Sequence, residues 1–350
     1  MPQRSSQPTV SRKREHIEVV LSKNVGFRGK TTGLGSIELQ HNALPEINLA
    51  DVDTSTVFLG KQLKYPLLVS SMTGGYSEAL RINRTLAEVC QEYGIAMGVG
   101  SQRQALESSK YHRTFSIARK SAPSIPIFGN IGAVEVASMK DESPALKLVE
   151  LIQADALAIH LNPLQEFLQP EGNTSFRGVF AGIERLVKRL PVPVIVKEIG
   201  AGLSGKVIRT LWNIGVRYID VAGAGGTSWA GVEVLRRKKV EPLTAFWDWG
   251  IPTVRAIREA AQYKAEAPYT LIASGGITSG LDVAKCIALG ADIVGVARPA
   301  LQALSKNGKK GLRKLLDRWI LELRGAMFLT GSIDISSLQK ATLMHGVSSG

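Results

Sequence analysis

The chain has 350 residues, of which 44% are apolar and 21% are charged, and this composition excludes a disordered, collagen-like or disulfide-rich protein. The 43 Lys and Arg residues outnumber the 30 acidic residues, which gives a formal net charge of +13. Such a charge is typical either of a solvated basic surface or of a protein with an anionic partner. Cys90 and Cys286 form no CxxC motif, so we expect buried, reduced thiols in a cytoplasmic protein. No apolar run approaches the length of a membrane span, and no membrane partner is expected.

Residues 1–65 precede the regular part of the sequence and are predicted to form an N-terminal extension that packs on the main domain. They are polar and basic up to about residue 35 and strand-like after it, and we expect the first ten residues to be disordered. The main domain covers residues 66–335. Residues 336–350 form a polar tail that is expected to fray.

Eight short apolar runs, each followed by Gly and small polar residues, divide the main domain. They cover residues 66–74, 94–102, 125–132, 156–162, 192–200, 217–226, 270–277 and 291–299. Because these runs do not alternate strictly, they favour parallel strands that are covered on both faces. Amphipathic stretches between them predict helices over 79–93, 144–153, 180–189, 205–214, 254–262 and 280–288. Eight strand-then-helix units predict an α/β protein with a (β/α)₈ TIM barrel.

The stretch 228–250 is inserted after the sixth predicted strand and breaks this rhythm. It carries a basic run at 236–239 and then the aromatic residues Phe246, Trp247 and Trp249. Two interpretations remain open: a flexible lid over the site, or a solvated surface insertion.

Hydrogen-bonding or ionisable residues follow nearly every predicted strand, at the barrel end where active sites lie. Gly275 and Gly276 follow strand seven and Arg298 follows strand eight, and together they predict a phosphate site. Lys197 ends strand five. It is expected either to pair with Glu198 or another carboxylate, to face a cofactor ring as a cation, or to act as a Schiff-base amine.

The segment 160–166, with the sequence HLNPLQE, concentrates the most chemistry. His160 and Asn162 share one face of a strand, and Gln165 and Glu166 fall on the loop after Pro163. A carboxylate such as Glu166 is most often a surface acid, but beside a diphosphate it would bind Mg²⁺. The sequence contains no HExxH, no Cys/His cluster and no GxSxG, so nothing supports a zinc enzyme or a triad hydrolase.

Taken together, the motifs resemble those of the type 2, FMN-dependent isopentenyl diphosphate isomerases, from residue 12 to about residue 331. The matching motifs are RKREHI (12–17), SSMTGG (70–75), GSQR (100–103), GNIG (129–132), HLNPLQE (160–166), VKEIG (196–200) and AGGTSW (224–229), followed by SGGI and ARP. The resemblance implies a homo-oligomer, tetramer or octamer, that interconverts isopentenyl and dimethylallyl diphosphate in isoprenoid biosynthesis. It also implies reduced FMN in the barrel, NADPH as its reductant, and Mg²⁺.

The resemblance further assigns roles to individual residues. Contacts with the flavin fall on Ser70, Ser71, Met72, Thr73, Ser101, Asn130, Lys197 and Thr227, and contacts with its phosphate on Gly275, Gly276, Ala297 and Arg298. Contacts with the substrate fall on Arg12, Lys13, Ser101, Gln102, Arg103, His160 and Gln165, and the metal falls on Glu166. Gln165 and His160 are the candidate catalytic residues.

The reaction implied by the resemblance adds a proton at one carbon and removes one at another. A cationic intermediate would be stabilised by a reduced, anionic flavin, which Lys197 near the N1/O2 edge would favour. We hypothesise that N5 of the reduced flavin exchanges the proton while Gln165 positions or relays it. His160 is expected to act as an acid or base or to hold the diphosphate.

Two other classes of protein share some of these sequence features. An FMN-dependent hydroxy-acid oxidase or dehydrogenase would share the phosphate site and the strand-five lysine, but the motifs HLNPLQE and RKREHI suit a diphosphate and Mg²⁺ instead. A nucleic-acid-binding protein is suggested only by the basic charge. The basic residues are dispersed and no binding motif accompanies them, so no nucleic-acid partner is expected.

Overall fold

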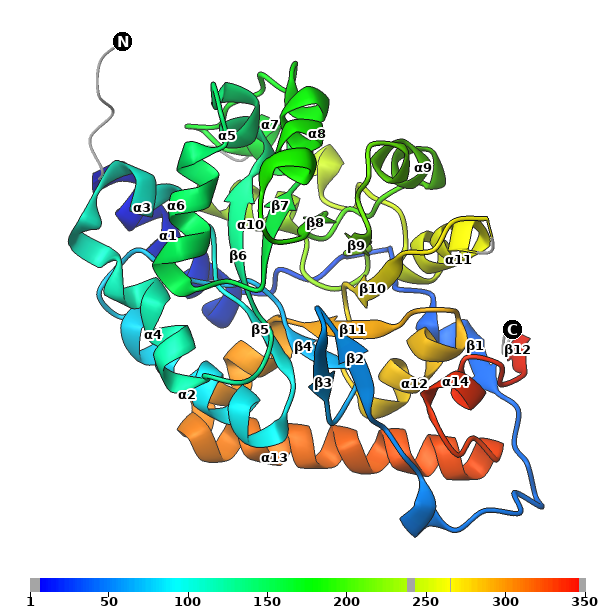
Figure 1. Ribbon diagram of the computed structural model, residues 1–350. Coiled ribbons are helices and arrows are strands. Elements are labelled where there is room, and N and C mark those ends of the chain that lie inside the picture. Colours follow the sequence, from blue (N-terminus) through cyan, green and yellow to red (C-terminus); the bar gives the residue numbers. More distant parts are fainter. Residues whose placement is uncertain (1–6, 238–242, 265, 346–350) are drawn as a thin grey trace.

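A closed barrel of eight parallel strands forms the centre of the computed structural model, which describes residues 7–237, 243–264 and 266–345 (Figure 1). In order around the barrel, the strands are β4 (Leu67–Val69), β5 (Ala96–Gly98), β6 (Ile127–Gly132), β7 (Ala156–His160), β8 (Val194–Lys197), β9 (Tyr218–Asp220), β10 (Thr270–Ser274) and β11 (Ile293–Val296). Strand β11 pairs with β4 and closes the barrel. Each strand lies inside one of the eight predicted runs, so the predicted (β/α)₈ barrel is confirmed.

Helices follow the strands and cover the outside of the barrel. The six predicted helices are present as α2 (Ala79–Tyr93), α6 (Ser143–Ile152), α8 (Val179–Arg189), α9 (Gly205–Asn213), α11 (Thr253–Lys264) and α12 (Gly280–Ala288). Helix α2 illustrates why the pattern worked: Leu86, Val89 and Cys90 lie on the face that is buried against the barrel, and Gly94 ends the helix with φ +61°.

The structure contains further helices that the sequence pattern did not predict. The shorter ones are α3 (Arg103–Glu107), α4 (Arg113–Ser121), α5 (Ala133–Ser138), α7 (Pro163–Leu168), α10 (Trp229–Arg236) and α14 (Ile335–Leu338), with 3₁₀ turns η1 (Leu34–Ser36), η2 (Leu49–Asp51), η3 (Ser109–Tyr111) and η4 (Leu243–Phe246). The long α13 (Arg298–Thr330) runs along one side of the barrel, orange to red in Figure 1, and has a kink at Asn307 and Gly308. Within the described residues, none of the helices combines the length and the apolar composition that a membrane crossing needs.

A short antiparallel hairpin plugs the end of the barrel opposite the strand C-termini. It consists of β2 (Thr56–Phe58) and β3 (Lys61–Leu63), joined at Leu59 and Gly60, which both have positive φ. Phe58 and Leu63 are buried among the side chains that fill the barrel interior, such as Leu68 and Phe128. Because this end is filled, a ligand has to enter at the other end.

The two chain ends are more ordered than the sequence suggested. Helix α1 (Gln7–Ser22) begins within the first ten residues, so the expected disorder is wrong for residues 7–10, while residues 1–6 lie outside the described part. Strand β12 (Leu343–His345) pairs with β1 (Ile37–Leu39), and Leu338 is fully buried. The expected fraying is therefore wrong for residues 337–345, because strand pairing and burial hold the tail against the extension.

The inserted stretch after β9 is not a solvated surface insertion over its first part. Residues 230–234 of α10 are buried, and the helix packs on α1 and α7 at the mouth of the barrel. Further along, Trp247 is buried and donates a hydrogen bond from Nε1 to the carbonyl oxygen of Gly26 (2.8 Å). Lys238 and Lys239 of the basic run lie outside the described residues. This stretch therefore covers the site as a packed helix.

Candidate functional site

A cavity of about 390 Å³ lies at the C-terminal ends of the barrel strands, beneath helix α1. Many of the residues that the sequence proposed for ligand binding line it: Lys13, Ser70, Ser71, Met72, Lys197, Thr227, Gly275, Gly276, Ala297 and Arg298. They come from the ends of different strands, which the barrel closure brings to one place. His16, Ile17 and Val20 of α1 complete the lining.

One end of the cavity is built from backbone. Gly275 and Gly276 have φ values of +103° and +74°, and a Cβ on Gly275 would collide with the carbonyl oxygen of Gly223. A Cβ on Gly226 would likewise collide with the backbone nitrogen of Gly276. Arg298 lies beside these glycines in the cavity lining, and its Nε is buried without a hydrogen-bond partner. Glycine backbone amides beside a guanidinium whose Nε lacks a partner are a set of donors that could hold an anion.

Two serines directly after β4 are also candidate ligand-binding residues. The hydroxyl oxygens of Ser70 and Ser71 are buried in the cavity wall and have no hydrogen-bond partner among the described residues. A buried polar group without a partner costs about 1–3 kcal/mol. These two hydroxyls therefore indicate that a polar ligand occupies this side of the cavity in the working protein.

Lys197 at the end of β8 has a carboxylate neighbour that the sequence analysis did not single out. Its Nζ donates to the backbone oxygen of Glu198 (2.5 Å) and lies 3.9 Å from Oδ2 of Asp220 on β9. The Glu198 carboxylate accepts backbone hydrogen bonds from residues 199–201 instead. Burial raises the pKa of Glu198 to about 7 and also raises that of Asp220. The carboxylate nearest to the amine of Lys197 is thus that of Asp220. The sequence signal that could have identified Asp220 is a charged residue at the end of an apolar strand.

Lys13 links helix α1 to the loops that follow β4 and β5 at the mouth of the barrel. Its Nζ donates to the carbonyl oxygens of Gly74 (2.8 Å) and Ser101 (2.6 Å). Burial, followed by the charge of Arg12, lowers the pKa of Lys13 to about 7. Burial and the charge of Arg103 lower the pKa of Arg12 as well. Positive groups are therefore crowded at the mouth, which is an unfavourable arrangement unless an anion binds there.

His160 at the end of β7 lies in this positive region. Its Nδ1 donates to Oδ1 of Asn130 (2.9 Å), which leaves Nε2 as the nitrogen without the proton. Burial, followed by the charges of Lys197, Lys13 and Arg12, lowers the pKa of His160 to about 3. The imidazole is therefore neutral at physiological pH in the unliganded protein.

Three of the predicted contact residues have their side chains engaged elsewhere. Gln102 is fully buried and supports β6, since it donates to the oxygen of Leu148 (3.0 Å) and accepts from the nitrogen of Asn130 (3.0 Å). The hydroxyl of Thr73 donates to that of Tyr76. Arg103 forms ion pairs with Glu135 (2.9 Å) and Glu107 (3.2 Å). Among the described residues that line the cavity, none of these three is present, and the same holds for the predicted contact residues Arg12, Ser101, Asn130, His160 and Gln165.

The predicted metal residue lies at the start of α7. Asn162 donates from Nδ2 to Oε1 of Glu166 (3.0 Å) and to Oε1 of Gln165 (3.1 Å), while Glu166 accepts a second bond from the nitrogen of Asn173 (2.6 Å). Oδ1 of Asn162 is buried without a partner. The part of the chain that the structure describes contains no group of three or more His, Cys, Asp or Glu side chains able to hold a metal. A cation here would need oxygen atoms from a ligand.

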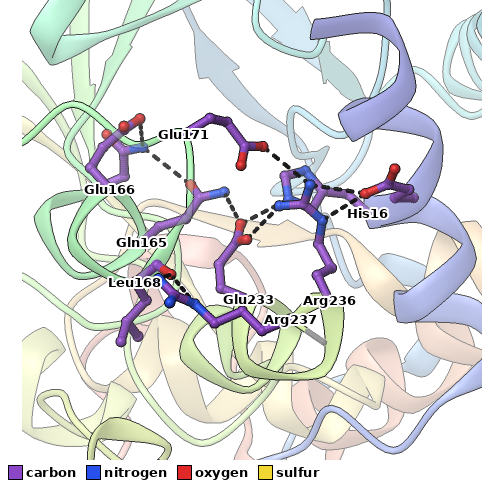
Figure 2. Close-up of polar contacts among 10 residues, drawn as sticks. His16, Gln165, Glu166, Leu168, Glu171, Glu233, Arg236 and Arg237 are labelled. Carbon is purple, nitrogen blue, oxygen red and sulfur yellow. Dashed lines mark hydrogen bonds and ion pairs between the residues drawn. The ribbon is translucent and has the colours of Figure 1, made fainter. Parts of the chain in front are cut away.

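The sequence analysis missed a further group of polar residues at the mouth, which Figure 2 shows around Glu233 of α10. This carboxylate accepts hydrogen bonds from Gln165 and from His16 of α1. It also pairs with Arg236 one turn further along α10. The available signal was weak: Glu233 is the single charged residue in the apolar stretch 229–235.

Comparison with known proteins shows the family and the fold of the chain. The family profile of FMN-dependent dehydrogenases matches residues 146–345. Among solved structures, a mandelate oxidase with a monooxide FMN adduct superposes with a TM-score of 0.68 over 97% of this chain and 99% of its own, at 19% identity, and a mandelate oxidase with (S)-2-phenylpropionate with a TM-score of 0.66. At this identity the likeness concerns the fold alone.

Curated relatives are much more similar in sequence. An isopentenyl-diphosphate delta-isomerase of Pelodictyon phaeoclathratiforme is 45% identical over 98% of this chain and 99% of its own length. Enzymes of the same name from Chlorobium limicola and from a Nostoc species are 47% and 46% identical, over 97% and 95% of both chains. The chain therefore belongs to the FMN-dependent dehydrogenase family and, within it, to the type 2 isopentenyl-diphosphate delta-isomerases.

Proposed function

We propose that this FMN-using isomerase interconverts isopentenyl diphosphate and dimethylallyl diphosphate with the help of Mg²⁺. The observation that carries the proposal is the crowding of Arg12, Lys13 and Lys197 around the neutral His160, next to a cavity with a separate anion site. Two anion sites are what a phosphate-bearing cofactor and a diphosphate substrate require. The relatives named isopentenyl-diphosphate delta-isomerase support the same reaction for this chain.

The cavity fits FMN. The glycine backbone at 275–276 and the unpaired Arg298 would hold its phosphate, and the unpaired hydroxyls of Ser70 and Ser71 would bond polar atoms of its ring. When bound in the reduced state, FMN would supply an electron-rich ring to the reaction. Lys197, held by Asp220, supplies the positive charge that favours the anionic form of that ring.

The mouth of the barrel fits a diphosphate with one magnesium ion. Arg12 and Lys13 supply positive charge, and Glu166 supplies a carboxylate for the metal. Asn162 donates to Glu166 from Nδ2, and its buried Oδ1, which has no partner, is a second oxygen in this neighbourhood. Oxygen ligands of this kind suit a hard cation, whose remaining ligands would be diphosphate oxygens and water.

The proton movements are assigned to residues of α7 and β7. A glutamine is a poor acid, so Gln165 orients the reacting group or passes a proton on without holding it. A histidine whose pKa is about 3 carries no proton on Nε2 at neutral pH, so His160 is not a general acid before the substrate binds, and a contact with the diphosphate requires that this nitrogen take up a proton. Binding of the diphosphate would raise this pKa, because the anion offsets the neighbouring cations.

Two further parts of the proposal concern the reductant and the assembly. NADPH is expected to reduce the bound FMN, although the net isomerisation is redox-neutral. A homo-oligomer, tetramer or octamer, is expected, and large apolar side chains on the surface, such as Leu321 and Trp249, suit such contacts. Light scattering after gel filtration measures the assembly directly.

An anaerobic assay with purified protein, FMN, NADPH and Mg²⁺ tests the function. Isopentenyl diphosphate is added and the formation of dimethylallyl diphosphate is followed with time. We expect turnover that disappears when either FMN or the metal is omitted. Absence of turnover from protein that has bound FMN would overturn the proposal, and oxidation of 2-hydroxy acids by the same sample would then indicate an oxidoreductase.

A further inference from the structure

Glu233 lies at the meeting point of three elements that are far apart in the sequence (Figure 2). Its carboxylate is completely buried, and Oε1 accepts hydrogen bonds from Nε2 of Gln165 (3.0 Å) and from Nε2 of His16 (2.8 Å). Oε2 accepts a bond from Arg236 (2.5 Å). The contacts join α10, which carries Glu233, to α1 and α7. Glu233 does not line the cavity, so it has no direct contact with a ligand there.

The surroundings keep this buried carboxyl ionised. Burial alone would raise the pKa of Glu233, but the hydrogen bond and charge of His16 and the charge of Arg236 outweigh it and lower the pKa. The guanidinium of Arg236 is itself almost buried, and Glu15 (2.9 Å) and Glu171 (3.2 Å) hold it in place. A buried charge persists only with such partners, because its loss of hydration is otherwise too costly.

An ionised carboxylate can only accept hydrogen bonds, and this restricts the two neighbouring side chains. The Gln165 amide has to point its nitrogen at Glu233, which directs its oxygen to Nδ2 of Asn162 (3.1 Å). Rotation of the amide by 180° would place two oxygens against each other at one end and two nitrogens at the other. His16, in turn, has to carry a proton on Nε2.

We infer that Glu233 is a positioning residue of the isomerase, and that its carboxylate fixes the orientation of the Gln165 amide in the reaction. The inference rests on the proposed function, in which Gln165 orients or passes the proton. The role requires an acidic side chain because an ionised carboxylate cannot donate a hydrogen bond. Its size and its contribution to packing are secondary.

Two substitutions of Glu233 separate this role from packing. Glu233→Gln keeps the shape but adds a donor that can face Gln165, so residue 233 no longer selects one orientation of the Gln165 amide and the contact with Asn162 alone still favours the observed one. Glu233→Asp is shorter but still only accepts. We expect kcat to fall about 10- to 100-fold in Glu233→Gln, with KM and the FMN dissociation constant within about twofold of wild type, and to fall less in Glu233→Asp. A packing role predicts the reverse order, and that order would overturn the inference.

Glu15→Gln is the matched control. It removes a carboxylate from the same guanidinium, but Glu15 contacts neither Gln165 nor His16 in the hydrogen bonds of the structure, and its side chain is half exposed. We expect its kcat to remain within about twofold of wild type. A loss in Glu15→Gln equal to that in Glu233→Gln would mean that Arg236, and not the amide orientation, governs the rate.

A double-mutant cycle with Gln165→Ala tests whether Glu233 acts through the amide. If it does, Glu233→Gln lowers kcat in the wild-type background but has no further effect on Gln165→Ala in single-turnover assays. Equal losses in both backgrounds would overturn the inference. If Glu233→Gln fails to retain FMN, Glu233→Asp replaces it in the same cycle. An inactive wild type contradicts the proposed function itself, whereas full activity of Gln165→Ala overturns the inference and leaves the proposed isomerase activity standing.

Discussion

The two ends of the site are built in different ways. The anion site of the cavity uses backbone amides at 275–276 and Arg298, which follow neighbouring strands of the barrel. The mouth uses side chains of α1, α7 and α10, and the residues of α1 and α7 that bond to Glu233 lie at least 68 positions from it in the sequence. Because backbone geometry follows from the fold, the first end tolerates few substitutions at its glycines. The second depends on matching charges among side chains, and each of its parts can be changed singly.

Gly275→Ala is expected to have the largest effect, because it disturbs the end built from backbone. The new Cβ would collide with the carbonyl oxygen of Gly223, and φ +103° is strained for any L residue. We expect a loss of about 3 kcal/mol in the free energy of unfolding and protein without FMN. Urea denaturation and the flavin absorbance measure both. Gly325→Ala, where the Cβ meets open space in α13, is the control and should be neutral or stabilising. Normal FMN content in Gly275→Ala would contradict the backbone-built site.

Glu166→Gln is expected to have the next largest effect, on the metal at the mouth. Replacing the carboxylate by a neutral amide removes the charge that would attract Mg²⁺, so the concentration of Mg²⁺ for half-maximal activity should rise on the order of 100-fold. Glu184→Gln, which removes an acid from an exposed ion pair on α8, is the control. An unchanged Mg²⁺ titration would remove Glu166 as the ligand.

Arg298→Ala changes the charged side chain that adds to the backbone amides at the glycine-lined end of the cavity. Loss of a charged hydrogen-bond donor should weaken FMN binding about 10- to 100-fold. Riboflavin, which lacks the phosphate, should bind wild type and Arg298→Ala equally. Fluorescence quenching of both flavins gives the two dissociation constants. Equal weakening for riboflavin and FMN would show that Arg298 does not hold the phosphate.

A pH dependence of substrate binding is expected from Lys13, whose pKa burial lowers to about 7. A bound diphosphate favours the charged amine and therefore raises the pKa of Lys13. Between pH 7 and the pKa of the complex, binding takes up a proton, and the affinity for the diphosphate falls by at most tenfold for each unit of rising pH. Below pH 7 the amine is already charged and the dependence ends. Calorimetry in buffers of different ionisation enthalpy measures the proton uptake, and Lys13→Arg should abolish it. Buffer-independent heats at pH 8 would refute the assignment.

The smallest effect concerns residues outside both ends. Cys90 and Cys286 are fully buried in α2 and α12, and burial raises the pKa of both thiols. Because only the thiolate reacts at a useful rate, we expect neither thiol of the folded protein to react with a disulfide reagent within an hour. Both should react after denaturation in urea. Rapid reaction of one thiol in the folded state would indicate local opening of its helix.

The barrel was predictable because its signals are local. Each strand appears as an apolar run, and the helix α2 was predicted at its observed bounds from the amphipathic spacing. Helix α1 was missed because the first part of its sequence is polar and basic. Contacts with distant elements stabilise it over the barrel: hydrogen bonds of Lys13 and His16, and packing of Val19 and Val20 against α10 and α13. The tail was missed for the same reason, since its pairing partner β1 lies near the other end of the chain.

The sequence by itself determined the (β/α)₈ barrel, the placement of Gly275, Gly276 and Arg298 at one end of the cavity, and the positions of Lys197, His160 and Glu166 at strand ends or just after them. These follow from periodicity and from the rule that barrel sites lie at the strand C-termini. The tertiary structure alone decided that Asp220 faces Lys197, that Gln102 turns into the core, and that Glu233 meets Gln165 and His16. The physical reason is that a side chain's partner depends on packing between distant segments, which no local pattern encodes.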